Sequence, residues 1–236
     1  MLYNSFMKRL LIEKLNNAGI SISDTEADKL VQFFDILTET NKHLNLTRIL
    51  SPEDAVEKHF RDSLEGMKLL PQGASLLDVG SGGGFPAIPL SIVRGDVSVT
   101  MLDSTGKKVD FLNTVCNQLS LNAKAIHARA EEFANTSSRE YYDVVTARAV
   151  ASLPTLLEYC LPFVKVGGIF IAYKTGEEEL LTAQKALSTL GGKLRSTIPY
   201  ELAGGDKRTL FVFEKIAPTP PKYPRGQGKP RQKPIQ

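Results

Sequence analysis

Four glycines fall within five residues where an apolar segment gives way to a predicted helix. The run Ser75–Val79 is short and strand-like, and Gly80, Gly82, Gly83 and Gly84 follow it. Glycines at a strand-to-helix turn let the backbone approach a ligand closely, and the first N–H groups of the helix can donate to it. The spacing therefore predicts a binding loop for an adenosine-containing cofactor. A tight turn without a ligand is the alternative interpretation.

The residue at position 85 separates two classes of cofactor. A dinucleotide fingerprint, G-x-G-x-x-G/A, needs a small residue there, next to the pyrophosphate, and Phe85 occupies the position. The string from Asp78 through Gly80, Gly82 and Gly84 reads D-x-G-x-G-x-G instead. It resembles the first motif of class I S-adenosylmethionine-dependent methyltransferases, whose cofactor has no phosphate. An NAD-dependent oxidoreductase is the alternative, and Phe85 disfavours it.

Asp103 ends the next predicted strand, 23 residues after Gly80. A carboxylate at this distance from a glycine loop can accept hydrogen bonds from both hydroxyls of a ribose. The spacing therefore supports an adenosine site. The alternative role is a cap for the helix that begins near Gly106, for which Ser104 and Thr105 are further candidates.

A parallel sheet is needed to bring these residues to one edge. From Ser75 onward, short apolar runs alternate with helical periodicity, a pattern typical of a parallel sheet covered on both faces. The last two runs are joined by residues 203–206, a connection that suits an antiparallel hairpin and is too short for a crossover helix. We predict an α/β, Rossmann-like fold with a seven-stranded mixed sheet that ends in an antiparallel hairpin. The predicted strands are Ser75–Val79, Val97–Leu102, Ala123–His127, Tyr142–Ala147, Gly168–Tyr173, Lys193–Tyr200 and Thr209–Glu214. The predicted helices between and after them cover 86–93, 106–119, 130–135, 152–161 and 177–190.

Residues 1–72 form a predicted helical section ahead of this sheet. Ser23 and Glu26 have the spacing of a capping box, which predicts a helix over 24–40. Pro52 suits the first turn of a further helix that extends to about Met67, with Ser51 as its N-cap. We therefore divide the chain into this helical section, a sheet domain over 73–216 and a tail over 217–236.

The tail differs from the rest of the chain in charge. It holds six of the 13 prolines and five of the 29 basic residues but no acidic residue, so the remainder carries 24 basic and 26 acidic side chains. Such a segment lacks the apolar periodicity needed to fold alone, and we expect it to be extended or flexible. Its charge indicates a polyanion as partner, because basic groups near phosphates release counterions. A solvated tail that aids solubility is the alternative.

Composition narrows the class of protein further. With 42% hydrophobic and 23% charged residues, the chain is typical of a globular protein. The longest uncharged stretch, 79–93, is interrupted by glycines and prolines and is too short to span a bilayer. Charged residues from Lys8 onward argue against a secretory segment, so we expect a cytoplasmic protein. Cys116 and Cys160 lie far apart, which predicts two buried thiols, neither a disulfide nor a metal site.

Further motifs show that the chain is similar to one family within the class I methyltransferases. Together with the glycine loop, they make the chain resemble the RsmG family, also known as GidB or glucose-inhibited division protein B. A small departure is Ala87, where many relatives have glycine. The segments that carry the resemblance are Asn45–Thr47, His59–Leu64, Leu77–Pro86, Lys107–Lys108, Phe111–Leu112, Ala130–Glu131, Thr146–Val150 and Lys222–Arg225.

The resemblance implies methyl transfer from S-adenosylmethionine to N7 of a guanine in small-subunit (16S) ribosomal RNA. S-adenosylhomocysteine would be the product, and no metal would be needed. The partner would be the RNA or the small-subunit particle, with no membrane, no obligate protein partner and a monomeric enzyme. The implied cofactor-binding residues are Asp78, Gly80, Gly82, Phe85, Asp103, Ser104, Thr105, Ala130, Glu131 and Arg148, and the implied catalytic residues are Arg148 and Asn45.

Methyl transfer to guanine N7 does not strictly require a general base. N7 is already a nucleophile, so alignment and exclusion of water can supply most of the catalysis. We therefore expect Arg148 to position the substrate, with a salt bridge as its alternative role. His59 and Asp62 are three residues apart, too few ligands for a zinc site, and we expect them to form a polar wall beside the glycine loop with Asn45 and Arg61.

Two other functions fit the same residues less well. A methyltransferase for small molecules or proteins would have no use for the basic tail. An RNA-binding or assembly factor with a vestigial pocket would not need to keep Asp78, Gly80, Gly82 and Asp103 together.

Overall fold

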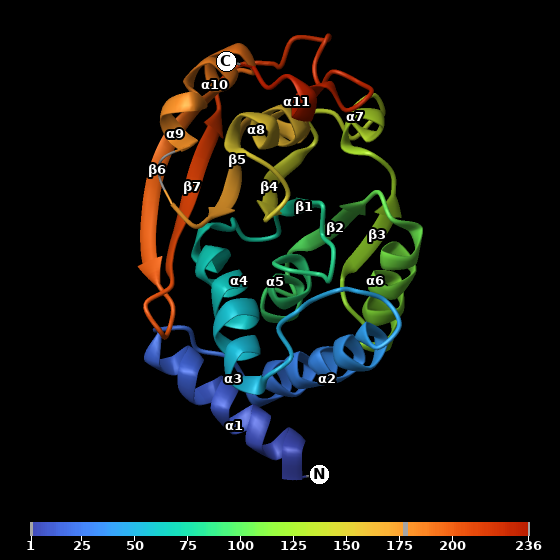
Figure 1. The fold of residues 1–236 in the computed structure, drawn as a ribbon, viewed down its shortest axis with the longest axis vertical. Helices are drawn as coiled ribbons and strands as arrows, with labels where there is room; N and C mark the ends of the chain where they lie inside the picture. The colour runs from blue at the N-terminus through green and yellow to red at the C-terminus, as the bar shows by residue number, and fades with distance from the viewer. Residues whose placement is uncertain (1, 177–178, 236) are drawn as a thin grey trace.

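The computed structural model describes residues 2–176 and 179–235, and a seven-stranded mixed sheet runs through its centre (Figure 1). The strand order is β3-β2-β1-β4-β5-β7-β6. Strands β1 to β5 are parallel, and β7 lies antiparallel between β5 and β6. The predicted fold, including its terminal hairpin, is confirmed. The strands are β1 Ser75–Val79, β2 Ser98–Asp103, β3 Ala123–His127, β4 Tyr142–Arg148, β5 Val164–Lys174, β6 Gly192–Glu201 and β7 Lys207–Lys215.

Helices cover both faces of the sheet because its strands alternate apolar side chains between two cores. Leu76 points into a core formed with the N-terminal section, α5 and α6, whereas Leu77 points into a core formed with α7, α8 and α10. Glu177 and Glu178, within one predicted helix, lie outside the described residues. The helices after β1 are α5 Ala87–Val93, α6 Gly106–Gln118, α7 Ala130–Phe133, α8 Leu153–Cys160, the 3₁₀ turn η3 Leu161–Phe163, α9 Glu179–Thr182, α10 Gln184–Thr189 and α11 Lys229–Gln232.

The N-terminal section contains helices as predicted, and its second helix has the predicted capping box. The Ser23 hydroxyl accepts from the Glu26 N–H, and the Glu26 carboxylate accepts from the Ser23 N–H. The single helix predicted from Pro52 to about Met67 is interrupted by a π-helical segment, whose wider turn the periodicity does not reveal. The elements are α1 Leu2–Asn17, α2 Asp24–Asn41, α3 Pro52–Ala55, the π-helix η1 Val56–Arg61, α4 Asp62–Leu64 and the 3₁₀ turn η2 Glu65–Leu69.

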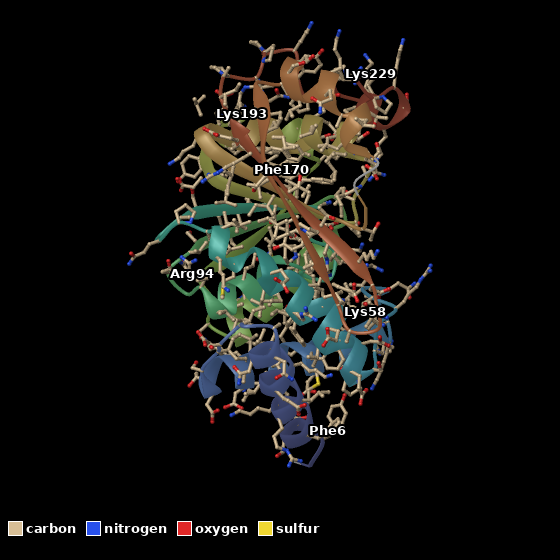
Figure 2. All side chains as sticks on the ribbon, turned by 90° about the vertical axis from the view of Figure 1, so that its left-hand side faces the viewer. Phe6, Lys58, Arg94, Phe170, Lys193 and Lys229 are labelled. Atoms are coloured by element: carbon tan, nitrogen blue, oxygen red, sulfur yellow. The ribbon has the colours of Figure 1, made fainter. Side chains whose placement is uncertain are left out.

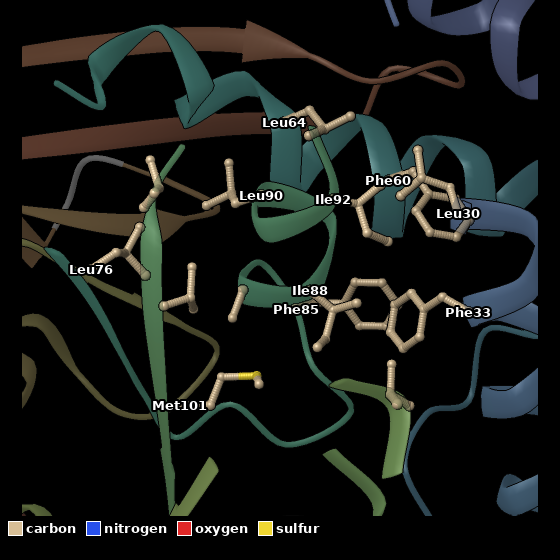
Figure 3. Packing of buried hydrophobic residues seen from close by; sticks show 14 of the residues in the cluster. Leu30, Phe33, Phe60, Leu64, Leu76, Phe85, Ile88, Leu90, Ile92 and Met101 are labelled. Carbon is tan, nitrogen blue, oxygen red and sulfur yellow. The ribbon is translucent and has the colours of Figure 1, made fainter. Parts of the chain in front are cut away.

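An aromatic cluster joins the N-terminal section to the glycine loop. The Phe85 ring lies 5.2 Å from Phe33 and 6.1 Å from Phe60, measured between ring centroids. Figure 3 shows these rings meeting beside Ile88 of α5. Phe85 is only 6% exposed, so most of its ring belongs to the core. The residue that disfavours a dinucleotide therefore also fixes the helical section against the loop.

The tail follows the protein surface instead of extending into solvent, which differs from the expectation drawn from its composition. Figure 1 shows it running past α8, where it forms the short helix α11, and Figure 2 places Lys229 at the opposite end of the molecule from Phe6 of α1. The Arg139 guanidinium donates to the Tyr223 and Thr219 carbonyl oxygens at 2.9 and 2.8 Å. The partners that order the tail are thus side chains of the sheet domain, which its own composition cannot reveal.

Two further expectations concern thiols and membranes. Cys116 and Cys160 are both buried and free, as predicted, and burial raises the pKa of Cys116 to about 11. Within the described ranges, no helix has the length and apolar character needed to cross a membrane.

Candidate active site

A cavity of about 510 Å³ opens where β1, β2 and β4 end. Carboxyl ends of parallel strands are the usual ligand-binding edge of such sheets. The wall of this cavity contains nine of the ten predicted cofactor-binding residues, Arg148 among them. The tenth, Asp78, does not line the cavity. The lining residues are Leu46, His59, Val79, Gly80, Ser81, Gly82, Gly83, Phe85, Leu102, Asp103, Ser104, Thr105, Lys108, Ala128, Arg129, Ala130, Glu131, Arg148, Ala149, Val150, Tyr159, Gly228 and Arg231.

The backbone of the glycine loop forms the floor of this cavity. The Gly80 and Ser81 N–H groups donate to the Leu102 carbonyl oxygen at 2.7 and 3.1 Å, which ties the loop to the end of β2. Gly80 has a φ of +76°, and a Cβ added there would lie 2.7 Å from a Val150 methyl carbon. A larger residue would be strained and would collide with the opposite wall. Glycine at this position therefore keeps the cavity open.

Asp103 lies between the loop and α6. Its carboxylate accepts from the Gly82 N–H and from the Thr105 N–H, both at 2.9 Å. The contact with Thr105 is a local turn interaction and not the helix cap considered as the alternative role, since Thr105 is the N-cap of α6 and no side chain of the described residues caps that helix. Because each carboxylate oxygen can accept more than one hydrogen bond, the same group retains acceptor capacity toward the cavity. Ser104 and Thr105 line the cavity beside it.

Asp78 lies beneath the loop and is 1% exposed. One of its carboxylate oxygens accepts from the Thr146 hydroxyl at 2.8 Å. The other, Oδ2, is among three buried side-chain polar atoms of the described residues that have no hydrogen-bond partner. Burial raises the pKa of Asp78 to about 6. An acceptor is thus held under the cavity floor without a partner from the chain itself.

Arg148 connects the cavity to the N-terminal section. Its guanidinium donates to an Asp62 carboxylate oxygen at 2.7 Å and to the Lys58 carbonyl oxygen at 3.0 Å. It also lies 5.2 Å from the centroid of the Phe85 ring. The salt bridge that we considered as the alternative role of Arg148 is therefore present, and the side chain lines the cavity as well.

His59 completes this wall. Its ring stacks on Phe85 with centroids 4.1 Å apart, and its Nε2 lies 2.8 Å from the Thr47 hydroxyl. Burial, followed by the charge of Arg148, lowers the pKa of His59 to about 3. The imidazole is therefore neutral at physiological pH. We call His59, Asp62, Phe85 and Arg148 the reaction wall.

Two residues that we expected in the polar wall lie elsewhere. Arg61 donates to a Glu57 carboxylate oxygen and to the Glu201 carbonyl oxygen, away from the cavity. Asn45 is exposed and lines an adjoining depression instead of the main cavity. Leu46 borders both hollows, so Asn45 lies at their rim. The loop after α2 is irregular, and its sequence gives no indication of this displacement.

At the opposite end, Ala130 and Glu131 line the cavity as predicted, and Glu131 is 8% exposed. Further lining residues were missed, among them Arg129, Tyr159 of α8, and Gly228 and Arg231 of the tail. Tyr159 is on a face of α8 that the helical pattern alone assigns to the core. The two tail residues follow from no motif, although their neighbours Lys222–Arg225 belong to the family resemblance.

The donors and acceptors of this cavity fit S-adenosylmethionine. Because Gly80 has no Cβ, a ligand can approach the loop backbone closely at this position. The Asp78 Oδ2, which has no hydrogen-bond partner among the described residues, supplies an acceptor near the loop. Arg129, Glu131 and Tyr159 surround the other end. Among the described residues, no three His, Cys, Asp or Glu side chains come together as a metal-binding group.

Sheet order, glycine loop and cavity together define the class I methyltransferase fold. Similar solved structures include an S-adenosylmethionine-dependent methyltransferase from Aquifex aeolicus, at 17% identity and a TM-score of 0.54, covering 78% of this chain and 98% of that chain. A branched-chain polyamine synthase from Thermus thermophilus has 13% identity and a TM-score of 0.59, and the match covers 80% of this chain and 64% of that chain. At these identities the likeness concerns the fold, which many reactions share.

Sequence comparison identifies the family. The family model for GidB, rRNA small subunit methyltransferase G, matches residues 26–207. Proteins called ribosomal RNA small subunit methyltransferase G are 45% identical over 234 residues in Acetivibrio thermocellus, covering 97% of both chains, and 43% identical over 232 residues in Leuconostoc citreum, covering 95% of this chain and 97% of the other. The chain belongs to the GidB family, and the resemblance seen in its motifs is confirmed.

Proposed function

We propose that this protein transfers a methyl group from S-adenosylmethionine to N7 of a guanine in small-subunit ribosomal RNA. Family membership supports the class of reaction and substrate. The observation that carries the proposal is one cavity that contains the glycine loop, Asp103 and Arg148 together. The chain is proposed to act as a cytoplasmic monomer, with the RNA or the small-subunit particle as its partner.

The cofactor would be held along the floor of the cavity. Gly80 and Gly82 admit its methionine portion, and Asp103 accepts from its ribose hydroxyls, with Ser104 and Thr105 beside it. Ala130 and Glu131 contact the adenine at the other end. When bound, S-adenosylmethionine supplies a methyl group already activated on a sulfonium.

The reaction wall suits a nucleophile that needs no deprotonation. Guanine N7 carries a free lone pair and becomes positively charged on methylation. His59 is neutral, and the Arg148 charge is balanced by Asp62 at 2.7 Å, so the wall adds little net positive charge at the reacting atoms. Arg148 can then position the base through the O6 acceptor next to N7. Alignment and water exclusion account for the rate without a general base.

Labelled methyl transfer tests this function directly. The purified protein is incubated with methyl-labelled S-adenosylmethionine and with either small-subunit RNA or small subunits from a strain that lacks the activity. We expect label on a guanine, located at N7 by its specific susceptibility to strand scission. Label on another atom, or none on either substrate despite measurable cofactor binding, would overturn the proposal.

Salt dependence tests the polyanion contact of the tail. Because the tail is packed on α8, its deletion would expose buried groups, so a point substitution is preferable. Lys229→Ala should lower the slope of log affinity against log salt concentration by about 1, if Lys229 contacts one phosphate. An unchanged slope would exclude a phosphate contact of Lys229.

A further inference from the structure

The tail contributes one side of the cavity although it lies 80 residues beyond the last strand end that lines it. Gly228 and Arg231 line the cavity, as does Tyr159 of α8. Arg231 also donates through its guanidinium to the Val150 carbonyl oxygen at 3.1 Å. Val150 is the residue whose methyl group faces Gly80 across the floor. One tail arginine thus both borders the cavity and supports the segment opposite the glycine loop.

A buried carboxylate anchors this part of the tail. Glu158 of α8 is completely buried, and its two carboxylate oxygens accept from the Arg225 backbone N–H at 2.8 Å, from Nε at 2.9 Å and from Nη2 at 2.6 Å. Bidentate arginine–carboxylate pairs are strong and geometrically specific. Glu158 is also the immediate neighbour of Tyr159, which lines the cavity.

Two further hydrogen bonds fix the position of α11 relative to that anchor. The Arg225 guanidinium also donates to the Lys233 carbonyl oxygen at 2.8 Å, which closes the segment on itself around Gly228 and Arg231. The buried Thr155 hydroxyl donates to the Pro230 carbonyl oxygen at 3.0 Å. Residues 223–233 therefore form a short clasp that is fastened to α8 at Arg225, before the two cavity-lining residues, and at Pro230, between them.

We propose that residues 223–233, the tail clasp, complete the cofactor pocket on the side opposite the glycine loop, with Glu158 and Arg225 as positioning residues and Arg231 as a pocket residue. The clasp acts by holding Arg231 against the Val150 segment, so that the pocket keeps its shape above Gly80. This inference rests on the proposed function, which names S-adenosylmethionine as the ligand of the cavity. It adds a role in cofactor affinity to the RNA contact proposed for the basic tail.

Charge removal at the anchor tests the clasp. Glu158→Gln keeps the shape of the side chain and an acceptor for the Arg225 N–H, while Arg225 is exposed enough to reach solvent. We expect the Kd for S-adenosylhomocysteine, measured by calorimetry without RNA, to rise roughly tenfold, as is typical of positioning contacts. Arg231→Gln should raise this Kd as well. In turnover, both variants should raise the KM for S-adenosylmethionine more than they lower kcat.

Glu140→Gln is the matched control. Glu140 accepts from the Thr219 N–H at 2.7 Å and pairs with buried Lys215, so it holds the beginning of the same tail without contacting the clasp. We expect a loss of thermal stability with an unchanged Kd. Equal Kd values for wild type, Glu158→Gln and Arg231→Gln at a temperature where all are folded would overturn the clasp. Failure of the unaltered protein to bind S-adenosylhomocysteine would overturn the proposed function and the clasp together, whereas absence of label at guanine N7 alone would leave the clasp result intact.

Discussion

Two walls of the cavity are held in different ways. At the reaction wall, Arg148 and Asp62 form an ion pair that is mostly buried, with side-chain exposures of 16% and 6%, and Tyr200 adds a hydrogen bond to Asp62 at 2.7 Å. At the tail clasp, Arg231 is exposed and makes one hydrogen bond to the Val150 carbonyl oxygen. One wall is part of the core, and the other is a surface segment fastened to it.

This difference matches what the reaction wall and the tail clasp each have to do. Alignment of two reacting atoms tolerates little displacement, so a rigid wall of buried, paired groups suits the reaction end. A cofactor has to enter and leave in every cycle, and elements that move with ligands are drawn from the less stable parts of a structure. Substitutions in the reaction wall should therefore affect turnover most, and substitutions near the clasp should affect cofactor affinity most.

Removal of Arg148 should give the largest effect. In Arg148→Ala, buried Asp62 loses its closer ion-pair partner and keeps Arg208 at 3.8 Å, which should destabilise the fold by about 3 kcal/mol. Loss of alignment should lower kcat by on the order of a hundredfold. Chemical denaturation and single-turnover methylation measure the two effects. The control Tyr200→Phe removes only one hydrogen bond to Asp62 and should cost about 1.5 kcal/mol with kcat largely retained. Wild-type turnover by Arg148→Ala would refute the role of the reaction wall.

Asp78, beneath the floor that both walls share, should show a pH-dependent effect on stability. Its pKa is raised from 3.8 to about 6, so the folded protein binds the proton more tightly than the unfolded chain. Stability is then lost as pH rises from about 4 to 6, and the loss stays constant above that range. Asp78→Asn should remove this loss, amounting to at most about 3 kcal/mol near neutral pH. Denaturation at pH 4 and pH 7 measures it, and an equal stability difference at both pH values would contradict the raised pKa.

Gly80→Ala should give a smaller effect, on cofactor affinity and on stability. The added methyl group would be strained at a φ of +76° and would collide with Val150, so we expect cofactor affinity to fall about tenfold. Gly204→Ala is the control, because Gly204 has a φ of +90° and an added Cβ meets nothing within 4 Å. The positive φ should cost each variant about 1 kcal/mol of stability, and the collision with Val150 should add to this cost in Gly80→Ala. Reduced cofactor affinity in both would attribute the effect to strain alone.

The sequence predicts the sheet well because its signals are local. Strand β1 and strand β3 match their predicted bounds, and the hairpin of β6 and β7 follows from a connection too short for a helix. The glycine loop and Asp103 were predicted for the same reason: both follow directly from a strand end. Parallel strands then bring them to one edge of the sheet, whatever the details of packing.

Contacts between distant segments account for what the sequence did not predict. The π-helical turn at Val56–Arg61 presents the Lys58 carbonyl oxygen to Arg148, a partner 90 residues away. The course of the tail depends on Glu158, which is acidic yet completely buried on α8. Neither partner is recognisable from the segment that it orders. Whether the chain divides at residues 72 and 216 as predicted stays a prediction.

The aromatic cluster around Phe85 has a consequence for the order in which the protein is made. Synthesis begins at the N-terminus, so Phe33 and Phe60 emerge from the ribosome before the glycine loop does. Their rings contact Phe85 in the finished core, and a shorter nascent chain would expose them. The helical section therefore has to wait for the loop before its core is complete. Conversely, the loop emerges next to a surface that is already prepared to receive it.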